Sequence, residues 1–166
     1  MAAPMTILAL DPGEVVLGYC LGSFTGQQRS IIQSGDLRDV DADKAVRWLD
    51  AICCDRWPLV IAVESYVFQG TDRSGNKNAF NISRLVGALQ GAALMWSKRA
   101  NDSITQVILV SKSDANASIG LTGATPKSRV RRAIEALFPG TKFANEHQVD
   151  AAAVLMAGRA RAGRFR

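Results

Sequence analysis

The 166 residues are enough for one well-packed domain and too few for two, and their 48% hydrophobic and 21% charged content is that of an ordinary globular protein. No apolar run approaches the roughly 20 residues of a membrane-spanning helix, and residues 1–5 lack the basic region of a signal or transit peptide, so we expect a cytoplasmic protein outside any membrane. The net charge of +5 is uneven: residues 112–166 carry 10 Lys and Arg against 4 Asp and Glu, which suits a polyanionic partner but also a solvated basic end.

Three strands in series are predicted in the first 40 residues. They cover Thr6–Leu10, Val15–Leu21 and Arg29–Ser34, because each is a short run rich in apolar residues beside turn-forming ones. The first run ends at Asp11-Pro12-Gly13, and Ser23–Gly26 supplies a hairpin turn between the second and third. The hairpin makes neighbouring antiparallel strands the expected arrangement.

The middle of the chain alternates helices with strands. Apolar residues at helical spacing predict helices over Asp41–Arg56, which Trp57-Pro58 ends, and over Ala79–Arg99. Continuous apolar runs predict strands over Leu59–Val63 and Gln106–Val110, of the kind that is buried on both faces. Residues 66–78 form a polar loop between the first of these strands and the long helix.

Three further helices are predicted after the last strand. They cover Ser113–Ile119, Pro126–Leu137 with proline near its first position, and an alanine-rich stretch from about Gln148 to Arg161. A turn over Gly120–Gly123 separates the first two. The whole pattern predicts an α/β fold, a mixed sheet with helices on its faces, as one domain over residues 1–166 with a basic tail over about 159–166.

Acidic residues occupy unusual places in this pattern. Asp11 ends the first strand, Glu64 ends the central strand, and His147 and Asp150 share one face at the start of the last helix. If these four side chains converge, they can hold two Mg²⁺ ions, for which Mn²⁺ could substitute. Two such ions are what phosphodiester hydrolysis needs to activate water and to stabilise charge on the attacking and leaving oxygens. Each residue also has an ordinary interpretation: Asp11 as a turn residue, Glu64 as a surface carboxylate, His147 as a structural histidine and Asp150 as a helix cap.

Five segments, taken in order, resemble the motifs of one known family. They are Leu8–Gly13 with Gly18-Tyr19 following, Ile61–Ser65, Leu85–Gly91, Gly120–Val130 and His147–Ala151. The chain is thereby similar to the RuvC-type Holliday junction resolvases over most of its length. The resemblance implies an RNase H-like fold, a homodimer, and paired symmetric nicks in four-way DNA junctions that leave 5′-phosphate and 3′-hydroxyl ends.

The same resemblance assigns roles to individual residues. Asp11, Glu64, His147 and Asp150 become metal ligands. In the mechanism that we expect from this set, Asp11 bridges two ions, Glu64 and Asp150 complete the sites, and His147 is a ligand or orients the attacking water. Lys127 becomes a basic catalytic residue near the scissile phosphate, and the Ala79–Arg99 helix becomes a candidate dimer interface. The expected DNA contacts are Tyr66, Phe68, Arg73, Lys77, Lys112, Lys127, Arg129, Arg131 and Arg132.

The chain also departs from the family pattern. Many members have Asp where His147 stands, although a histidine also occurs there, and the stretch from Glu64 to Gly87 is longer than expected. Family members often place a junction-opening aromatic three residues after the glutamate, where this chain has Val67. That role stays open between Tyr66 and Phe68, and ordinary loop packing is the alternative for both.

Other functions compete on the same motifs. The motif Asp-x-Gly after a first strand also occurs at the beginning of actin-like ATPases and sugar kinases. Those proteins need two such domains and therefore about twice the length of this chain. Another RNase H-like nuclease, a YqgF-type RNA processor or a flap-cutting phage enzyme, would keep the chemistry and change the substrate. A non-catalytic junction-binding protein is a third alternative, and four competent ligand types at the four positions argue against it.

Overall fold

The computed structural model describes residues 4–13, 15–53, 60–65, 83–92, 94–95 and 106–162. Within them, one mixed sheet has the strand order β3-β2-β1-β4-β5. The strands are β1 (Met5–Pro12), β2 (Val16–Thr25), β3 (Gln28–Arg38), β4 (Val60–Glu64) and β5 (Gln106–Val110). The first three pair antiparallel, whereas β4 and β5 continue the sheet parallel to β1.

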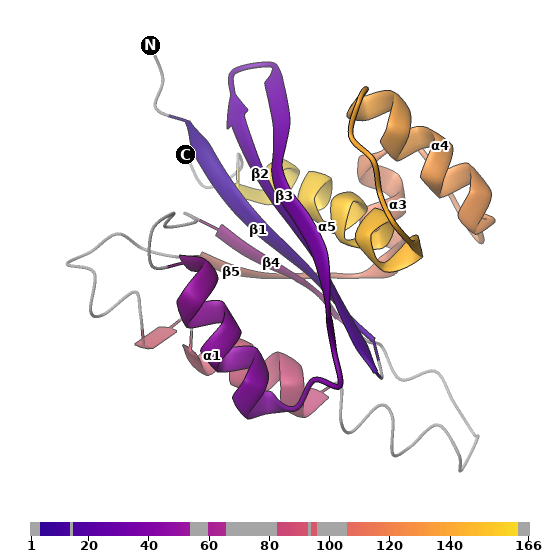
Figure 1. Ribbon diagram of the computed structural model, residues 1–166. Coiled ribbons are helices and arrows are strands. Elements are labelled where there is room, and N and C mark those ends of the chain that lie inside the picture. The colour runs from indigo at the N-terminus through magenta and orange to yellow at the C-terminus, as the bar shows by residue number, and fades with distance from the viewer. Residues whose placement is uncertain are drawn as a thin grey trace.

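Helices cover both faces of this sheet (Figure 1). One face carries α1 (Ala42–Cys53) and the helical residues 83–92, and the other carries α3 (Lys112–Ser118), α4 (Lys127–Leu137) and α5 (Glu146–Ala162). The predicted fold class, an α/β sheet with flanking helices, is therefore confirmed. Within the described residues no helix is long and apolar enough to cross a membrane.

The alternation of side chains along β1 and β4 decides where polar groups can point. In β1, Ile7 and Ala9 pack on the α5 side and Leu8 and Leu10 pack on the α1 side, all of them fully buried. Successive strand residues point to opposite faces, so the next residue, Asp11, points to the α5 side. In β4, Val60 and Ala62 face α5, and the same alternation points Glu64 to that side as well.

Helix α5 lies directly against the sheet because its contact residues are small. Ala151, Ala152 and Ala153 are buried, and a side chain at Gly158 would place its Cβ 2.7 Å from the Cβ of Ala62. The helix is buried over most of its length, which fits its lack of a polar face. This close packing fixes the position of the first turn of α5 at the ends of β1 and β4.

Most predicted elements are confirmed with small shifts of their bounds. The hairpin turn is wrong: β2 continues through Thr25, and the turn is Gly26-Gln27, with Gly26 at φ 59° in the first central position. The strand is longer because Phe24 is a buried core residue rather than a turn residue. Pro126 is the N-cap of α4, one position before the predicted one. Residues 54–59 and most of the loop after Glu64 lie outside the described residues.

Candidate active site at the ends of β1 and β4

Two carboxylates meet where β1 and β4 end side by side. The parallel register pairs Leu10 with Val63, so the next residues, Asp11 and Glu64, emerge from neighbouring strands at one edge of the sheet. Both are on the α5 side, and Asp11 is only 9% exposed. The adjacency that the sequence pattern predicted for these two residues is thereby present in the fold.

The first turns of α5 bring His147 and Asp150 to the same edge. His147 Nδ1 lies 3.0 Å from Asp11 Oδ2, which makes a direct hydrogen bond between the last helix and the first strand. Asp150, 7% exposed, contacts the cluster through a lysine described below. The four residues singled out as an acidic constellation therefore lie at one place, contributed by β1, β4 and α5.

Two glycines allow His147 to come this close. A Cβ at Gly18 would lie 2.5 Å from the carbonyl oxygen of His147, and one at Gly13 would lie 3.1 Å from its Cε1. Any larger residue at Gly18 would push the start of α5 away from β2, because real Cβ atoms do not approach backbone this closely. Gly18 belongs to a segment that the sequence analysis quoted as a motif, and its steric role explains why that segment matters.

A lysine completes the cluster. Lys112 Nζ lies 2.9 Å from Asp150 Oδ1 and 3.6 Å from Glu64 Oε2, and its side chain is 46% exposed. The sequence analysis placed Lys112 only among DNA contacts. Its place in the cluster had a signal that was missed: Lys112 comes two residues after β5, which is parallel to β4 and ends at the same edge of the sheet.

Two carboxylates of the cluster, Asp11 and Glu64, have raised pKa values. Burial raises the pKa of Glu64 to about 7, with the charges of Asp11 and Asp150 adding to the effect and Lys112 opposing it. Burial also raises the pKa of Asp11, although its hydrogen bond with His147 works in the other direction. Glu64 Oε2 is buried and makes no hydrogen bond with the described residues. Burial therefore disfavours the charged forms of Asp11 and Glu64.

The donors of this cluster fit a divalent cation. Carboxylate oxygens and one imidazole are ligand types that hard Mg²⁺ and the somewhat softer Mn²⁺ accept. Glu64 Oε2 makes no hydrogen bond with the described residues and can therefore bind a cation. Within the described residues, however, no three Asp, Glu, His or Cys side chains are gathered tightly enough to hold one ion as they stand. The Lys112 ammonium contacts two of the carboxylates instead.

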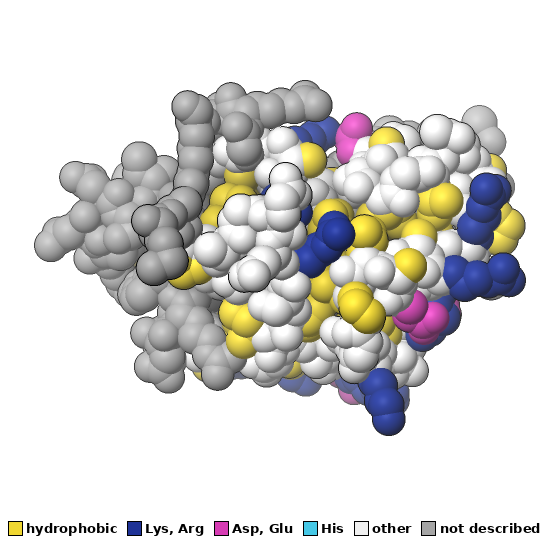
Figure 2. All heavy atoms as spheres, turned by 90° about the horizontal axis from the view of Figure 1, so that it is seen from above, with side chains coloured by type: hydrophobic (Ala, Val, Ile, Leu, Met, Phe, Trp, Pro, Cys, Tyr) yellow, Lys and Arg dark blue, Asp and Glu magenta, His cyan; other side chains and the backbone are white. Residues whose placement is uncertain are grey.

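The other predicted site residues lie around the cluster or outside the described residues. Lys127, Arg129 and Arg132 are exposed at the beginning of α4. Figure 2 shows Lys and Arg side chains gathered on the right-hand side of the molecule, the side on which α4 lies in Figure 1. The expected DNA contacts Tyr66, Phe68, Arg73 and Lys77 lie outside the described residues.

Arg131 points a different way from its neighbours on α4. Its Nε and Nη2 donate to Glu146 Oε1 at 2.9 and 2.8 Å, and its Nη1 donates to the carbonyl oxygen of Phe143 at 3.2 Å. These bonds hold α4 against the start of α5. Arg131 thus positions the helix that carries His147 and Asp150, whatever else it contacts.

A polar network that the sequence analysis missed also fixes the start of α5. Asn145 and Gln148 both donate to Asp36 Oδ2 on β3, and the backbone N–H of Gln148 donates to Asn145 Oδ1 at 3.1 Å. Asp36 is more than 100 residues from both of its partners, so no local pattern predicts these two bonds. They anchor the residues on both sides of His147.

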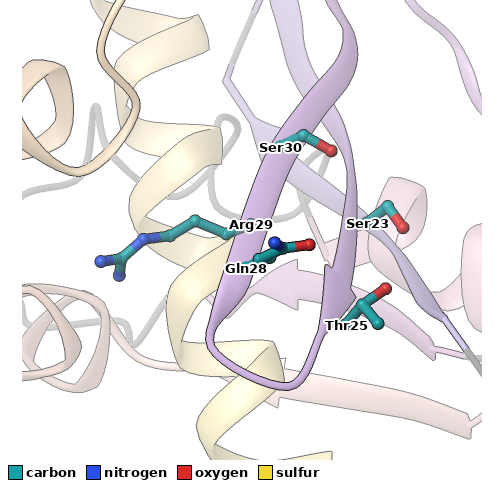
Figure 3. Close-up of a pocket in the computed structure, with 5 residues that line it drawn as sticks. All are labelled: Ser23, Thr25, Gln28, Arg29 and Ser30. Atoms are coloured by element: carbon teal, nitrogen blue, oxygen red, sulfur yellow. The ribbon is translucent and has the colours of Figure 1, made fainter. Parts of the chain in front are cut away.

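Two hollows differ in their relation to the cluster. One, of about 520 Å³, runs from Lys112, Ser113 and Asn116 to the loop residues 123–126, directly before Lys127. The other, of about 340 Å³, is on the β2–β3 hairpin, where Ser23 pairs with Thr6 at the opposite end of β1 from Asp11. Figure 3 shows that Arg29 extends away from the hydroxyl groups of Ser23, Thr25 and Ser30, so the groups of this second hollow do not converge.

Comparisons with known proteins agree on one group of relatives. No family model matches the chain. The chain is 33% identical over 159 residues to the crossover junction endodeoxyribonuclease RuvC of Sphingopyxis alaskensis, covering 90% of this chain and 94% of that protein. It is 31% identical over 153 residues to the RuvC of Zymomonas mobilis, covering 90% and 87%.

Solved structures are similar over nearly the whole chain. RuvC of Thermus thermophilus in complex with a Holliday junction substrate superposes with a TM-score of 0.77 at 18% identity, covering 96% of both chains. The yeast mitochondrial Holliday junction resolvase gives a TM-score of 0.65 at 15% identity, covering 98% of this chain and 82% of the other. The expected RNase H-like fold is confirmed by these superpositions.

Proposed function

Because the chain belongs to the RuvC family of crossover junction endodeoxyribonucleases, we propose that it hydrolyses DNA at four-way junctions in a metal-dependent reaction. The observation that carries the proposal is the convergence of Asp11, Glu64 and Asp150 from three separate elements onto one partly buried edge of the sheet. A fold that needed these residues only as turn or cap residues would have no reason to gather their charges.

The same convergence supports a metal requirement. Asp11, Glu64 and Asp150, with His147 beside them, would hold two Mg²⁺ ions, and Mn²⁺ would substitute. Bound divalent cations supply an activated water and stabilise the charge that develops on the phosphate oxygens. Bound cations would also favour the ionised form of Glu64, whose pKa is raised mainly by burial.

The remaining residues orient the reacting groups. Asp11 Oδ2 fixes the ring of His147 through Nδ1, and the ring is 40% exposed, so Nε2 is the atom placed to orient the attacking water and take its proton. Lys127 and the exposed arginines at the beginning of α4 would hold the phosphates that flank the cut. Water attacks the phosphorus directly, the P–O3′ bond breaks and the leaving 3′ oxygen takes up a proton, which leaves 5′-phosphate and 3′-hydroxyl ends with no covalent intermediate.

Resolution of a junction needs two active sites, and we propose a homodimer that makes paired symmetric nicks. The long helix predicted over 79–99 is the candidate interface. In its described part, Leu94 and Met95 are 58% and 59% exposed, as expected of apolar residues that a second protomer covers. Four-way DNA junctions in the cytoplasm of a bacterial or phage-infected cell are the proposed substrate.

Nicking assays test this function directly. We would incubate the protein with labelled four-way junction, flap and linear duplex DNA in Mg²⁺, Mn²⁺ or EDTA, and compare Asp11→Asn with Asp43→Asn, an exposed carboxylate on α1. Paired nicks in the junction are expected, absent in EDTA and in Asp11→Asn and retained in Asp43→Asn. Equal cleavage of flaps would widen the substrate to branched DNA in general, and junction binding without cleavage in either metal would refute the nuclease proposal.

A further inference from the structure

Lys112 contacts carboxylates that the proposed function assigns to metal ions. We propose that Lys112 is an internal counter-ion of the metal-free site, that divalent cations displace it, and that the displaced side chain then binds the DNA backbone. This inference rests on the metal site of the proposed function. It adds a second role for one residue, in which metal binding and DNA binding are linked.

The geometry makes Lys112 and a cation competitors. The ammonium uses Asp150 Oδ1 at 2.9 Å and approaches Glu64 Oε2 at 3.6 Å, which are oxygens that a metal ion in this cluster would use. Two positive charges that share the same oxygens repel each other strongly in a partly desolvated site. Simultaneous occupation is therefore unfavourable, and one of the two must leave.

Lys112 can leave without disturbing the fold. It is the first residue of α3, on a flexible stem, and its side chain is 46% exposed. The helix start is held independently, because the Ser111 hydroxyl accepts a hydrogen bond from the backbone N–H of Asp114 at 3.1 Å. Arg131, in contrast, is fixed by several hydrogen bonds and has no comparable freedom.

The hollow next to the cluster offers the displaced ammonium another partner. Asn116 lies one turn after Lys112 on α3, lines the same hollow, and is 6% exposed with its Oδ1 buried and lacking a hydrogen-bond partner in the described structure. If a cation takes Glu64 Oε2 and the ammonium turns to Asn116 Oδ1, the cation replaces the ion pair that Glu64 Oε2 makes with Lys112, and Asn116 Oδ1 gains a hydrogen-bond partner. The exchange therefore satisfies a buried acceptor that otherwise has no hydrogen bond.

The same movement places the ammonium on a path for DNA. The hollow extends from Lys112 past Ser113 to residues 123–126, immediately before Lys127. A DNA strand that runs from the acidic cluster to the beginning of α4 would pass its phosphates over this hollow. Because coupling between two ligands is reciprocal, DNA that holds Lys112 there would also favour metal binding.

Calcium titration of the DNA-free protein tests the first half of the proposal. We would measure Ca²⁺ binding by isothermal titration calorimetry for the wild type, Lys112→Met and Lys142→Met, an exposed lysine whose loss changes the net charge equally. Lys112→Met is expected to bind Ca²⁺ about tenfold more tightly, and Lys142→Met to match the wild type. In EDTA, Lys112→Met should melt below Lys142→Met, and saturating Ca²⁺ should remove that difference.

Junction binding tests the second half. Fluorescence anisotropy of a labelled four-way junction, checked to be uncut, would be measured in EDTA and in Ca²⁺ for Lys112→Met and Lys127→Met. Loss of Lys112 should weaken binding several-fold in Ca²⁺ and little in EDTA, whereas loss of Lys127 should weaken binding in both. Equal losses for Lys112→Met in the two conditions would refute the displacement.

The remaining outcomes separate this inference from the proposed function. A protein that binds Ca²⁺ and nicks junctions, but whose Ca²⁺ affinity is unchanged in Lys112→Met, overturns the inference alone. A wild type that binds neither Ca²⁺ nor Mg²⁺ overturns the metal site and the inference with it. If Lys112→Met does not fold in EDTA, Lys112→Arg replaces it: a guanidinium held by two oxygens should weaken Ca²⁺ binding, and unchanged or tighter binding would refute the proposal.

Discussion

Replacing Glu64 by glutamine should stabilise the metal-free protein while abolishing its nuclease activity. Glu64 is a largely buried carboxylate beside the charges of Asp11 and Asp150, and its Oε2 has the Lys112 ammonium at 3.6 Å but no hydrogen bond with the described residues. Glutamine keeps the shape and removes the charge. The expected gain follows from the cost of keeping this carboxylate ionised in the folded state.

The size of the gain follows from the pKa. A rise from the ordinary value of 4.5 to about 7 makes the ionised folded protein less stable by about 3 kcal/mol at pH 8. The amide must also be desolvated, so we expect a net gain of about 1–3 kcal/mol for Glu64→Gln, which raises Tm by roughly 3–8 °C for a chain of this size. The loss of one partner of Lys112 is small, because Asp150 retains the closer contact.

The pH dependence gives this prediction its sharpest test. Between pH 4.5 and 7 the folded wild type holds a proton on Glu64 that the unfolded chain has released, so wild-type stability falls as the pH rises through this window. The advantage of Glu64→Gln should therefore be absent near pH 4, grow up to pH 7 and stay constant above it. Thermal denaturation in EDTA from pH 4 to 8 measures the difference, and excess Mg²⁺ should stabilise the wild type only. A difference that is zero, or that does not change with pH, would refute the reasoning.

Two substitutions test the packing around the site, and one chemical probe tests the core beside it. Gly18→Ala should cost about 2–3 kcal/mol in urea denaturation and reduce nicking, because its Cβ would lie 2.5 Å from the His147 carbonyl oxygen; wild-type stability would contradict this. Arg131→Met should lower stability by about 1–2 kcal/mol and weaken junction binding less than Arg132→Met does, since Arg131 is bonded to Glu146; the reverse order would identify Arg131 as a DNA contact. Burial raises the pKa of Cys20 to about 12, so Cys20 should resist iodoacetamide at pH 8 until urea is added. Rapid labelling of Cys20 in the native protein, located by mass spectrometry of its peptides, would disprove its burial.

The sequence predicted the acidic residues of the site because each is tied to a local pattern. Asp11 and Glu64 end apolar runs that are long enough to be strands, and His147 and Asp150 are three residues apart on an alanine-rich helix. The convergence of Asp11 and Glu64 then depends only on β1 and β4 being parallel neighbours, which the fold class makes natural, whereas that of His147 and Asp150 also requires α5 to pack closely on the sheet. Local patterns of this kind can be recognised in a single sequence.

The partners of these residues were not predictable in the same way. The bonds of Asp36 with Asn145 and Gln148, and of Arg131 with Phe143, depend on which elements pack together after folding. A polar side chain on a helix or strand has the same sequence signature whether it faces water or a distant partner. Lys112 is an intermediate case, because the strand order that reveals its position was itself only inferred.

The packing of α5 links the core of the protein to its chemistry. Residues 151–158 let this helix lie flat on the sheet, and none of them has a polar side chain that could contact a substrate. Their packing nevertheless determines how close His147 and Asp150 lie to β1. Enlarging one of them would move His147 and Asp150 together, so its effect on catalysis should exceed its effect on DNA binding through the exposed Lys127, Arg129 and Arg132 of α4. The buried carboxylates reduce the stability of the metal-free fold, while the apolar layers on both faces of β1 and β4 stabilise it. In the proposed metal site, the same core that holds these carboxylates in place would also give them a high affinity for cations.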